Sequence, residues 1–293
     1  FSTGVKAIDS MLTSGKGQKI GIFAGSGVGK STLMGMIVKG CEAQIKVVAL
    51  IGERGREIPA FIHYNLNNNM ENTILVTATS DESALMRKYG AFTAMAIAEF
   101  FRDKGHDVLL MMDSVTRFAM AQRDIGLSTG EPPVSRGYPP SVFALLPQLM
   151  ERAGNNKKGS ITAFFTVLVD GDDMNDPIAD QSRSILDGHI VLTRELTEQG
   201  FYPPINLLKS ASRGMDKVVN KEHYNDFLKL KRVLSLIKEN EVLVRVGAYK
   251  AGMDPELDNA MAKKEKIREF LTQDTQQIIG FNDTVAMFKK VLQ

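Results

Sequence analysis

The chain has 293 residues, of which 43% are hydrophobic, so it is long enough to bury one large core and a smaller second unit. Its formal net charge of +2 gives no indication of binding to nucleic acid or to an anionic membrane. The single cysteine, Cys41, argues against a disulfide framework and a structural zinc site and fits a reducing cytoplasm, and no apolar run approaches the roughly 18 residues of a membrane span. Because residue 1 is Phe rather than Met, we expect a fragment or a processed chain.

Six short apolar runs predict buried strands. They are rich in Val, Ile and Leu and lack clean alternation with polar residues, which favours a sheet covered on both faces. The runs are 19–24, 46–51, 73–78, 107–112, 161–169 and 188–193. Helical patterns lie between them, for example 81–104, for which we expect Ser80 to be the N-cap. This alternation predicts an α/β domain with a mainly parallel sheet.

The pattern changes after about Ser212. The run "NLLKSA" (206–211) is the last predicted strand, and residues 222–240 and 258–273 are charged and helix-periodic. We therefore predict two domains, an α/β domain over residues 1–218 and a small helical domain over residues 219–293.

The stretch "AGSGVGKST" (24–32) predicts a phosphate-binding loop. It matches the pattern G-x-x-x-x-G-K-[ST] except that Ala24 replaces the first glycine, and it lies between a predicted strand and a predicted helix. Backbone N–H groups of 25–32 would then face phosphate oxygens, Lys30 would reach the terminal phosphates, and the Ser31 hydroxyl would bind Mg²⁺. The alternative is a glycine-rich turn with a surface lysine. The predicted nucleotide-binding residues are Gly25, Ser26, Gly27, Val28, Gly29, Lys30, Ser31 and Thr32.

Two further strands end in charged residues. Asp113 directly follows a run of apolar residues that ends in a methionine pair in "DVLLMMDSVTR", as the aspartate that holds the Mg²⁺ water shell does in P-loop proteins. Glu53 and Arg54 follow the strand "KVVALI" directly. Because ligands bind at the carboxyl ends of parallel strands, we expect Glu53 to activate water and Arg54 to stabilise charge on the γ-phosphate. The alternative for "GERGRE" is a solvated charged turn.

Together these motifs resemble the ATPases of bacterial type III secretion, most closely those of flagellar export, which are similar to the catalytic subunit of rotary ATP synthases. The resemblance rests on "STGVKAIDSMLTSGKGQKIGIFAGSGVGKST", "IGERGRE", "DSVTRFAMAQRDIGLSTGEPPVSRGYPPSVFALLPQLMERAG", "DDMNDPIADQSRSILDGHIVLTREL", "ASRGMDK" and "EVLVRVGAYKAGMDPELDNA". It covers nearly the whole chain. It implies a RecA-like P-loop domain followed by the helical domain, without the N-terminal β-barrel of the relatives.

The resemblance also implies roles for single residues. Glu53 corresponds to the catalytic base, which the non-catalytic subunits lack. Arg213 corresponds to the arginine finger that reaches a neighbouring subunit, and Tyr202 to the aromatic residue that packs on adenine. Arg117 would support the phosphate site, and Phe281 is a looser match for the other side of the adenine pocket.

Simpler interpretations stand beside these roles. Tyr202 fits a loop aromatic that covers a core edge, Arg213 fits a cap on the last strand, and His189 fits a hydrogen-bonded strand histidine better than a ligand or an acid.

The resemblance implies a Mg²⁺-dependent ATP hydrolase that energises or primes protein export. It implies a homo-hexamer in the full-length protein, located in the cytoplasm at the secretion apparatus and peripherally associated with the membrane export gate. Its partners would be stalk and regulator proteins, export chaperones and substrates, and no nucleic acid. The alternatives are a catalytic subunit of a rotary ATP synthase, an RNA-translocating hexameric helicase of the transcription-termination type, and a non-hydrolysing regulatory subunit, against which Glu53 argues.

Overall fold

A computed structural model describes residues 1–68, 70–169, 171 and 173–292. One sheet crosses the described structure, and its strands follow the order β3-β2-β4-β6-β1-β7-β8. The strands from β3 to β7 in this order run parallel, whereas the two-residue strands β8 and β5 pair antiparallel with β7 and β6. Their bounds are β1 Lys19–Ala24, β2 Ile45–Ile51, β3 Thr73–Ala78, β4 Asp107–Asp113, β5 Gly154–Asn155, β6 Ser160–Leu168, β7 Gly188–Val191 and β8 Ala211–Ser212.

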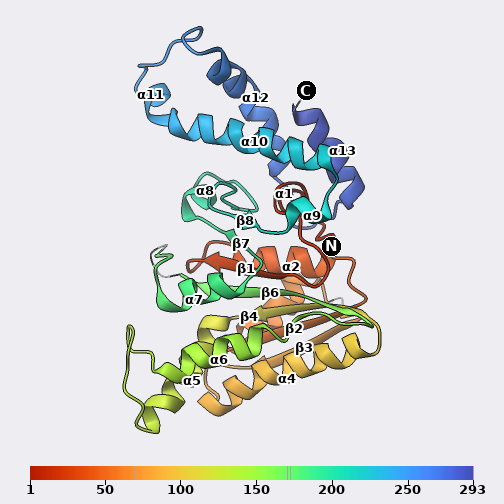
Figure 1. Cartoon of the computed structure of the whole chain (residues 1–293), viewed down its shortest axis with the longest axis vertical. Helices are drawn as coiled ribbons and strands as arrows, with labels where there is room; N and C mark the ends of the chain where they lie inside the picture. Colours follow the sequence, from red (N-terminus) through yellow and green to blue (C-terminus); the bar gives the residue numbers. More distant parts are fainter. Residues whose placement is uncertain (69, 170, 172, 293) are drawn as a thin grey trace.

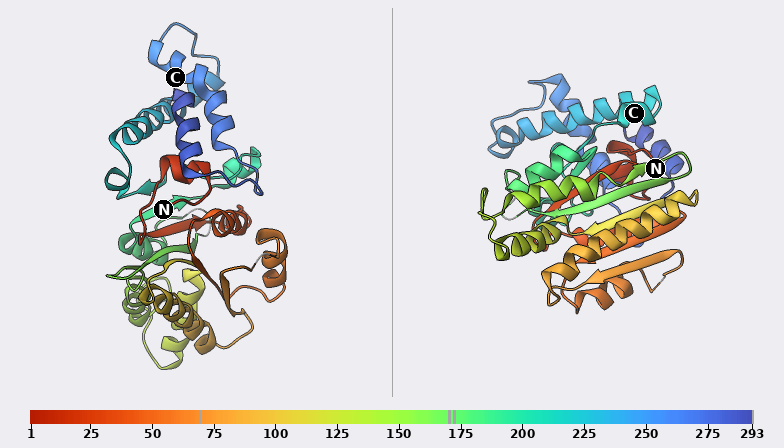
Figure 2. Two further views of the ribbon diagram at one scale, coloured as in Figure 1. Left: turned by 90° about the vertical axis from the view of Figure 1, so that its right-hand side faces the viewer. Right: turned by 60° about the horizontal axis from the view of Figure 1, so that its bottom comes forward.

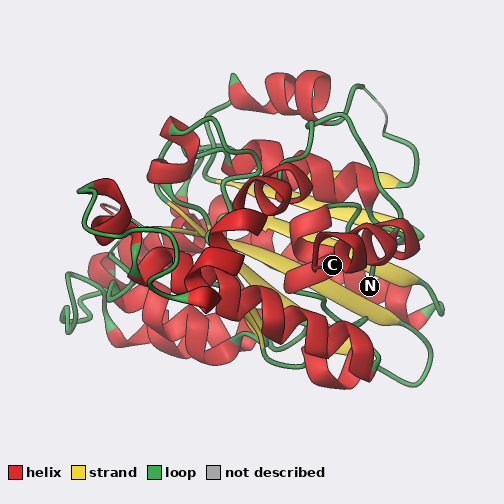
Figure 3. Ribbon diagram, turned by 90° about the horizontal axis from the view of Figure 1, so that it is seen from above, coloured by secondary structure: helices red, strands yellow, loops and turns green. Residues whose placement is uncertain are grey.

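Helices cover both faces of the sheet, as the lack of alternation in the strands predicts (Figures 1 and 3). Neighbouring residues of β1 belong to different cores, since Ile22 packs with α1, α2 and the C-terminal helices and Phe23 packs with α4, α5, α6 and α7. The helices of the two layers are α1 Lys6–Met11, α2 Lys30–Gly40, α4 Ala84–Asp103, α5 Val115–Ser128, α6 Pro140–Met150 and α7 Pro177–Ile185. The predicted α/β fold with a mainly parallel sheet is confirmed.

Helices make up most of the chain after β8. The two predicted helical patterns correspond to α10 and α12, whose N-caps are the side chains of Asn220 and Asp254. Figures 1 and 2 show these helices at one end of the molecule, with α1 between them and the sheet. The bounds are α9 Met215–Val218, α10 Lys221–Glu239, α11 Glu241–Arg245, α12 Pro255–Leu271 and α13 Phe281–Leu292. No helix among the described residues is long and apolar enough to cross a membrane.

Two local predictions are wrong. Helix α4 begins at Ala84, and its N-cap is Ser83 rather than Ser80, because the Ser83 hydroxyl accepts the N–H of Met86 at 3.2 Å. The run 206–211 is mostly a turn, since the Asn206 side chain accepts the Lys209 N–H at 3.0 Å and competes with an extended backbone.

The N-terminal segment joins the sheet to the C-terminal helices. Asp9 in α1 is fully buried, and its carboxylate accepts the backbone N–H groups of Thr3 and Gly4 at 2.9 and 3.1 Å. The amide of Gln273, which follows α12, accepts the Lys6 N–H at 2.8 Å and donates to the Gly4 carbonyl at 2.8 Å. One buried cluster of hydrogen bonds therefore joins the N-terminal segment to the segment that follows α12.

The substitution Asp9→Ala would remove the acceptor of these buried N–H groups. Because unsatisfied buried donors cost about 1–3 kcal/mol each, we expect Asp9→Ala to lower the free energy of unfolding by about 2–4 kcal/mol. Urea denaturation checks this expectation. The control Glu265→Ala, at an exposed position on α12, should change the free energy by less than about 0.5 kcal/mol.

Candidate functional site

The glycine-rich loop connects β1 to α2 at the carboxyl edge of the sheet. Strand β1 ends at Ala24 and α2 begins at Lys30. Gly27 and Gly29 have φ values of 75° and 96°, which a residue with a Cβ adopts only at a cost. These two glycines turn the chain so that it enters α2, and the helix N-terminus presents free N–H groups to the space above the loop.

Three charged side chains from three elements meet beside this loop. The Lys30 ammonium lies 2.5 Å from Oδ1 of Asp113, at the end of β4, and 3.6 Å from Oε1 of Glu53, which follows β2. Their side chains are only 12%, 4% and 16% exposed. Parallel strands bring their carboxyl ends to one edge, so the sheet places the three predicted residues together.

Thr166 supports the position of Asp113. Its hydroxyl donates to Oδ1 of Asp113 at 2.6 Å from the neighbouring strand β6. This residue is absent from the sequence prediction. The run "ITAFFTVLV" contains two polar residues among apolar ones, Thr162 and Thr166, and both are fully buried. Because a buried polar group needs a hydrogen-bond partner, a threonine within such a run is the signal that points to this role.

The surroundings of Glu53 disfavour the ionised form of its carboxyl group. Burial is the largest cause of a raised pKa for this carboxyl, and the negative charge of Asp113 raises the pKa further. The Lys30 ammonium opposes both effects, and Glu57 adds to the increase. A carboxyl group with a raised pKa binds a proton more readily than an ordinary glutamate, which suits a general base.

Arg54 and Ser31 lie at the solvent side of this edge. The Arg54 side chain is 66% exposed and lies 3.7 Å from the Glu57 carboxylate, so it points to α3 (Glu57–Ala60) rather than to Lys30. Ser31 is exposed in the first turn of α2, and its carbonyl accepts the side-chain N–H of Asn65 at 3.0 Å. Asn65 ends the π-helical turn Phe61–Asn65.

The segment after β7 lies against the phosphate loop. Tyr202 and Pro204 are close enough to Gly29 that a Cβ at Gly29 would lie 3.9 and 3.6 Å from them. The five-residue helix α8 (Arg194–Glu198) supports the loop directly: Arg194 donates to the Ser26 carbonyl at 3.2 Å, and Thr197 donates to the Val28 carbonyl at 3.3 Å. The family resemblance implies Tyr202 at this site, whereas the support from α8 was not expected.

The remaining candidates lie elsewhere or have structural partners. Arg213 is exposed and donates to the Arg183 carbonyl at 3.1 Å. Phe281 packs against the ring of His223, with centroids 6.0 Å apart, and the described residues show no ring contact between it and Tyr202.

Arg117 and His189 complete the set of candidates. Arg117 lies along Gly52, next to Glu53, and its Nε atom is buried without a hydrogen-bond partner among the described residues. His189 faces the Lys209 carbonyl with Nε2 at 3.0 Å, and burial lowers its pKa, so it is a hydrogen-bonded strand residue.

The fold and the loop between β1 and α2 define a P-loop nucleotide-binding protein. The family model described as "ATP synthase alpha/beta family, nucleotide-binding domain" matches residues 4–212, and the model "T3SS EscN ATPase C-terminal domain" matches residues 219–290. The chain therefore belongs to the ATP synthase alpha/beta family, within its type III secretion branch of ATPases.

Curated relatives agree with this assignment. The chain is 62% identical over 294 residues to the "Flagellum-specific ATP synthase" of Helicobacter pylori (strain J99), and the match covers 100% of this chain and 68% of the relative. Identity is 56% to the protein of the same name from Bacillus subtilis, with 98% and 66% covered. It is 49% to the "Type 3 secretion system ATPase" of Xanthomonas euvesicatoria, with 99% and 66% covered. The chain thus spans about two thirds of these relatives.

Solved structures separate the alternatives. The assembled ATPase EscN from enteropathogenic E. coli superposes with a TM-score of 0.96 at 53% identity, covering 100% of this chain and 71% of that chain. An ATP synthase subunit from Nanoarchaeum equitans superposes with a TM-score of 0.90 at only 27% identity, covering 100% and 74%. The resemblance to secretion ATPases is confirmed, and it is favoured over the rotary ATP synthase.

The raised pKa of Glu53 depends partly on its neighbour Glu57. Because Glu57 contributes to that increase, Glu57→Gln should lower the pKa of Glu53 toward its ordinary value of 4.5. A pH titration of the Glu53 carboxyl carbon by NMR measures this change, and Asp81→Asn, at a fully exposed site, is the control.

The same shift has a consequence for stability. Since the pKa of folded Glu53 is raised, its contribution to stability is fully present below pH 4.5 and is lost as the pH rises through the raised pKa. Glu57→Gln should weaken this dependence. An unchanged titration in Glu57→Gln would contradict the assigned cause.

Proposed function

We propose that this protein is a Mg²⁺-dependent ATP hydrolase that energises or primes protein export through the flagellar type III secretion apparatus in the cytoplasm. The observation that carries the proposal is the position of the Lys30 ammonium between Asp113 and Glu53 at the mouth of the phosphate loop. The names of the relatives support export as the process that uses the hydrolysis.

The proposed nucleotide site uses the loop and the segment after β7. Backbone N–H groups of residues 25–32 bind phosphate oxygens, and Lys30 exchanges its carboxylate partners for the terminal phosphates. The Tyr202 ring, which borders Gly29, packs on adenine. Arg54 is exposed and joins the phosphate site only by leaving Glu57.

The residues present fit a Mg²⁺ ion. This ion usually takes one or two protein oxygens and completes its shell with water and substrate phosphates. The Ser31 hydroxyl and the Asp113 carboxylate are such oxygens, and the described residues contain no larger cluster of metal-binding side chains. When bound, Mg²⁺ would neutralise charge on the phosphates.

Glu53 orients the attacking water and accepts its proton. Its carboxyl lies beside Lys30, and its raised pKa favours proton transfer from water that attacks in line. Arg117, which runs along Gly52 with its Nε free of protein hydrogen bonds, holds the phosphate side of the site.

We propose a homo-hexamer as the active form. Arg213 is exposed and bound to a backbone carbonyl rather than to its own phosphate loop, which suits a residue that serves a neighbouring subunit. The solved relatives include an assembled EscN and EscN "in complex with its central stalk EscO". The predicted loop between Gly126 and Ser141 is our candidate for the stalk contact, although its ends belong to α5 and α6 and the connection itself covers residues 129–139.

Further partners follow from the same proposal. Regulators, chaperones and export substrates would bind the ring, which would associate peripherally with the membrane export gate. Residues 1–218 would act as the catalytic domain and residues 219–293 as a helical domain.

Two substitutions separate binding from chemistry. Lys30→Ala should weaken ATP binding and abolish turnover, because it removes the charge nearest the phosphates. Glu53→Gln should preserve ATP binding and lower the turnover rate by ~10²–10⁴-fold, the usual contribution of a general base. Isothermal titration of ATP and a phosphate-release assay measure the two quantities.

Each variant has an outcome that opposes the proposal. Unchanged ATP affinity in Lys30→Ala would exclude the phosphate loop, and a normal rate in Glu53→Gln would mean that another residue activates water. Adding RNA to the wild-type protein should leave the rate unchanged, whereas stimulation would favour the translocating helicase.

Mixing two inactive variants tests whether Arg213 acts as an arginine finger on a neighbouring subunit. Arginine fingers contribute about 10³–10⁵-fold in rate, so Arg213→Ala and Glu53→Gln should each be inactive alone. In mixed rings some interfaces join an intact Glu53 to an intact Arg213, and turnover should return. Inactive mixtures that still form hexamers would show that Arg213 does not act between subunits.

A further inference from the structure

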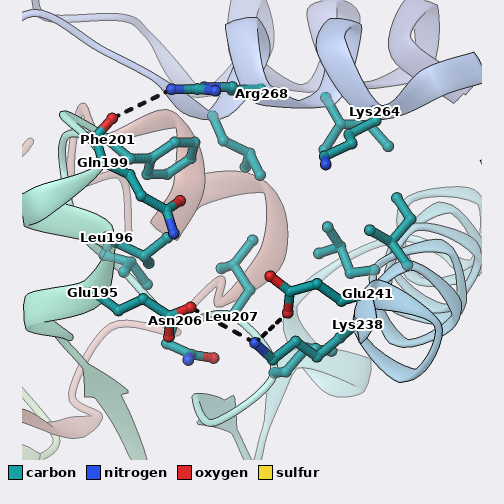
Figure 4. Close-up of a pocket in the computed structure, with 16 residues that line it drawn as sticks. Glu195, Leu196, Gln199, Phe201, Asn206, Leu207, Lys238, Glu241, Lys264 and Arg268 are labelled. Atoms are coloured by element: carbon teal, nitrogen blue, oxygen red, sulfur yellow. Dashed lines mark hydrogen bonds and ion pairs between the residues drawn. The ribbon is translucent and has the colours of Figure 1, made fainter. Parts of the chain in front are cut away.

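A cavity of about 300 Å³ lies between the segment around α8 and the helices α10 and α12 (Figure 4). This volume is at the lower end of the range for small-molecule sites, about 300–1,000 Å³. Lys30, Glu53, Asp113 and Tyr202 do not line it, so it is distinct from the proposed nucleotide site.

Apolar side chains form most of the cavity wall. Leu196 and Phe201 line it from the side of α8, and Leu234 and Ile237 line it from α10. All four are only half-buried, so they leave apolar surface exposed to the cavity. Ile267 of α12 completes the wall. Binding of an apolar ligand of matching size would remove this surface from water, which would stabilise the complex.

The charged side chains at the rim of the cavity differ in whether they have an ion-pair partner. Lys238 forms ion pairs with Glu241 at 2.7 Å and with Glu195 at 3.7 Å, so its charge is compensated across the cavity. In the described part of the chain, the Lys264 ammonium has neither an ion pair nor a hydrogen bond, and Figure 4 shows its side chain beside the cavity. The Arg268 guanidinium donates to the Gln199 carbonyl at 3.3 Å.

We propose that this cavity binds a small amphipathic carboxylate, with its apolar body against Leu234 and Ile237 and its carboxylate on Lys264. Two features select this class of ligand. The wall is apolar and of small-molecule size, and the free charge at its rim is positive and belongs to a lysine, with an arginine one turn away.

A ligand bound in the cavity would affect the nucleotide site through α8. Glu195 and Leu196 line the cavity, while Arg194 and Thr197 of the same helix donate to carbonyls of the phosphate loop. This coupling rests on the proposed function of that loop. It requires reciprocity: the ligand changes ATP affinity by the same factor by which ATP changes ligand affinity, typically about 5-fold or more.

Calorimetric titration of the protein with octanoate, without nucleotide, tests the site itself. We expect one saturable site. Lys264→Gln should weaken octanoate binding by up to about fivefold, the upper end of the range for an ion pair in contact with solvent. Lys266→Gln, an exposed lysine on the same helix outside the cavity, is the matched control and should bind normally. Ile237→Trp should block binding by filling the cavity.

Three outcomes would overturn the proposal: no binding, equal binding in wild type and Lys264→Gln, or octanol binding as tightly as octanoate. Circular dichroism of Ile237→Trp verifies its fold, and the Lys264→Gln comparison stands if that variant misfolds. A second titration with ATP present tests the coupling separately. Identical octanoate affinities with and without ATP would exclude the coupling, whereas failure of ATP to bind at all would oppose the proposed function and not the cavity site.

Discussion

The ion pair between Lys30 and Asp113 determines how this edge of the sheet is organised. Two like charges, Asp113 and Glu53, lie within reach of one buried ammonium, and neither carboxylate is well solvated. Removing the cation would leave uncompensated negative charge in a poorly hydrated site, which is strongly unfavourable. An incoming polyphosphate can take Lys30 away from the carboxylates only if it brings its own counter-charge, so a nucleotide with a bound divalent cation suits this site better than a bare one.

Supporting residues explain why the site is stable although its loop contains so many glycines. The loop has no apolar side chain in the core except Val28, and its conformation depends on its neighbours. Hydrogen bonds from α8 fix two of its carbonyls, which leaves the N–H groups free to face a ligand. The hydrogen bonds from α8, rather than the loop's own side chains, therefore fix the conformation of the loop.

The sequence predicted the sheet and the charged residues at its edge because both depend on local patterns. Apolar runs mark the strands, and the rule that ligands bind at carboxyl ends brings Lys30, Glu53 and Asp113 together without knowledge of the strand order. The roles of α8 and Thr166 depend on which strands are neighbours, and the sequence alone does not state this. The predicted strand at 206–211 is wrong because the Asn206 side chain competes with the backbone hydrogen bonds of a strand. The predicted N-cap of α4 is wrong because Ser80 and Ser83 are both residues that can cap a helix, and the sequence does not distinguish them.

The hydrogen bonds of Gln273 have a consequence for the order of folding. They join residues 267 and 269 positions apart in the chain, among the longest separations that a chain of this length allows. During synthesis at about 5–20 residues per second, α1 would wait roughly 13–54 seconds for Gln273 to emerge. Until then Ile8 and Met11, which the finished protein buries, lack their C-terminal partners. Helix α1 is made long before it is enclosed, so the nascent chain passes through a long interval in which chaperones have an exposed apolar segment to protect.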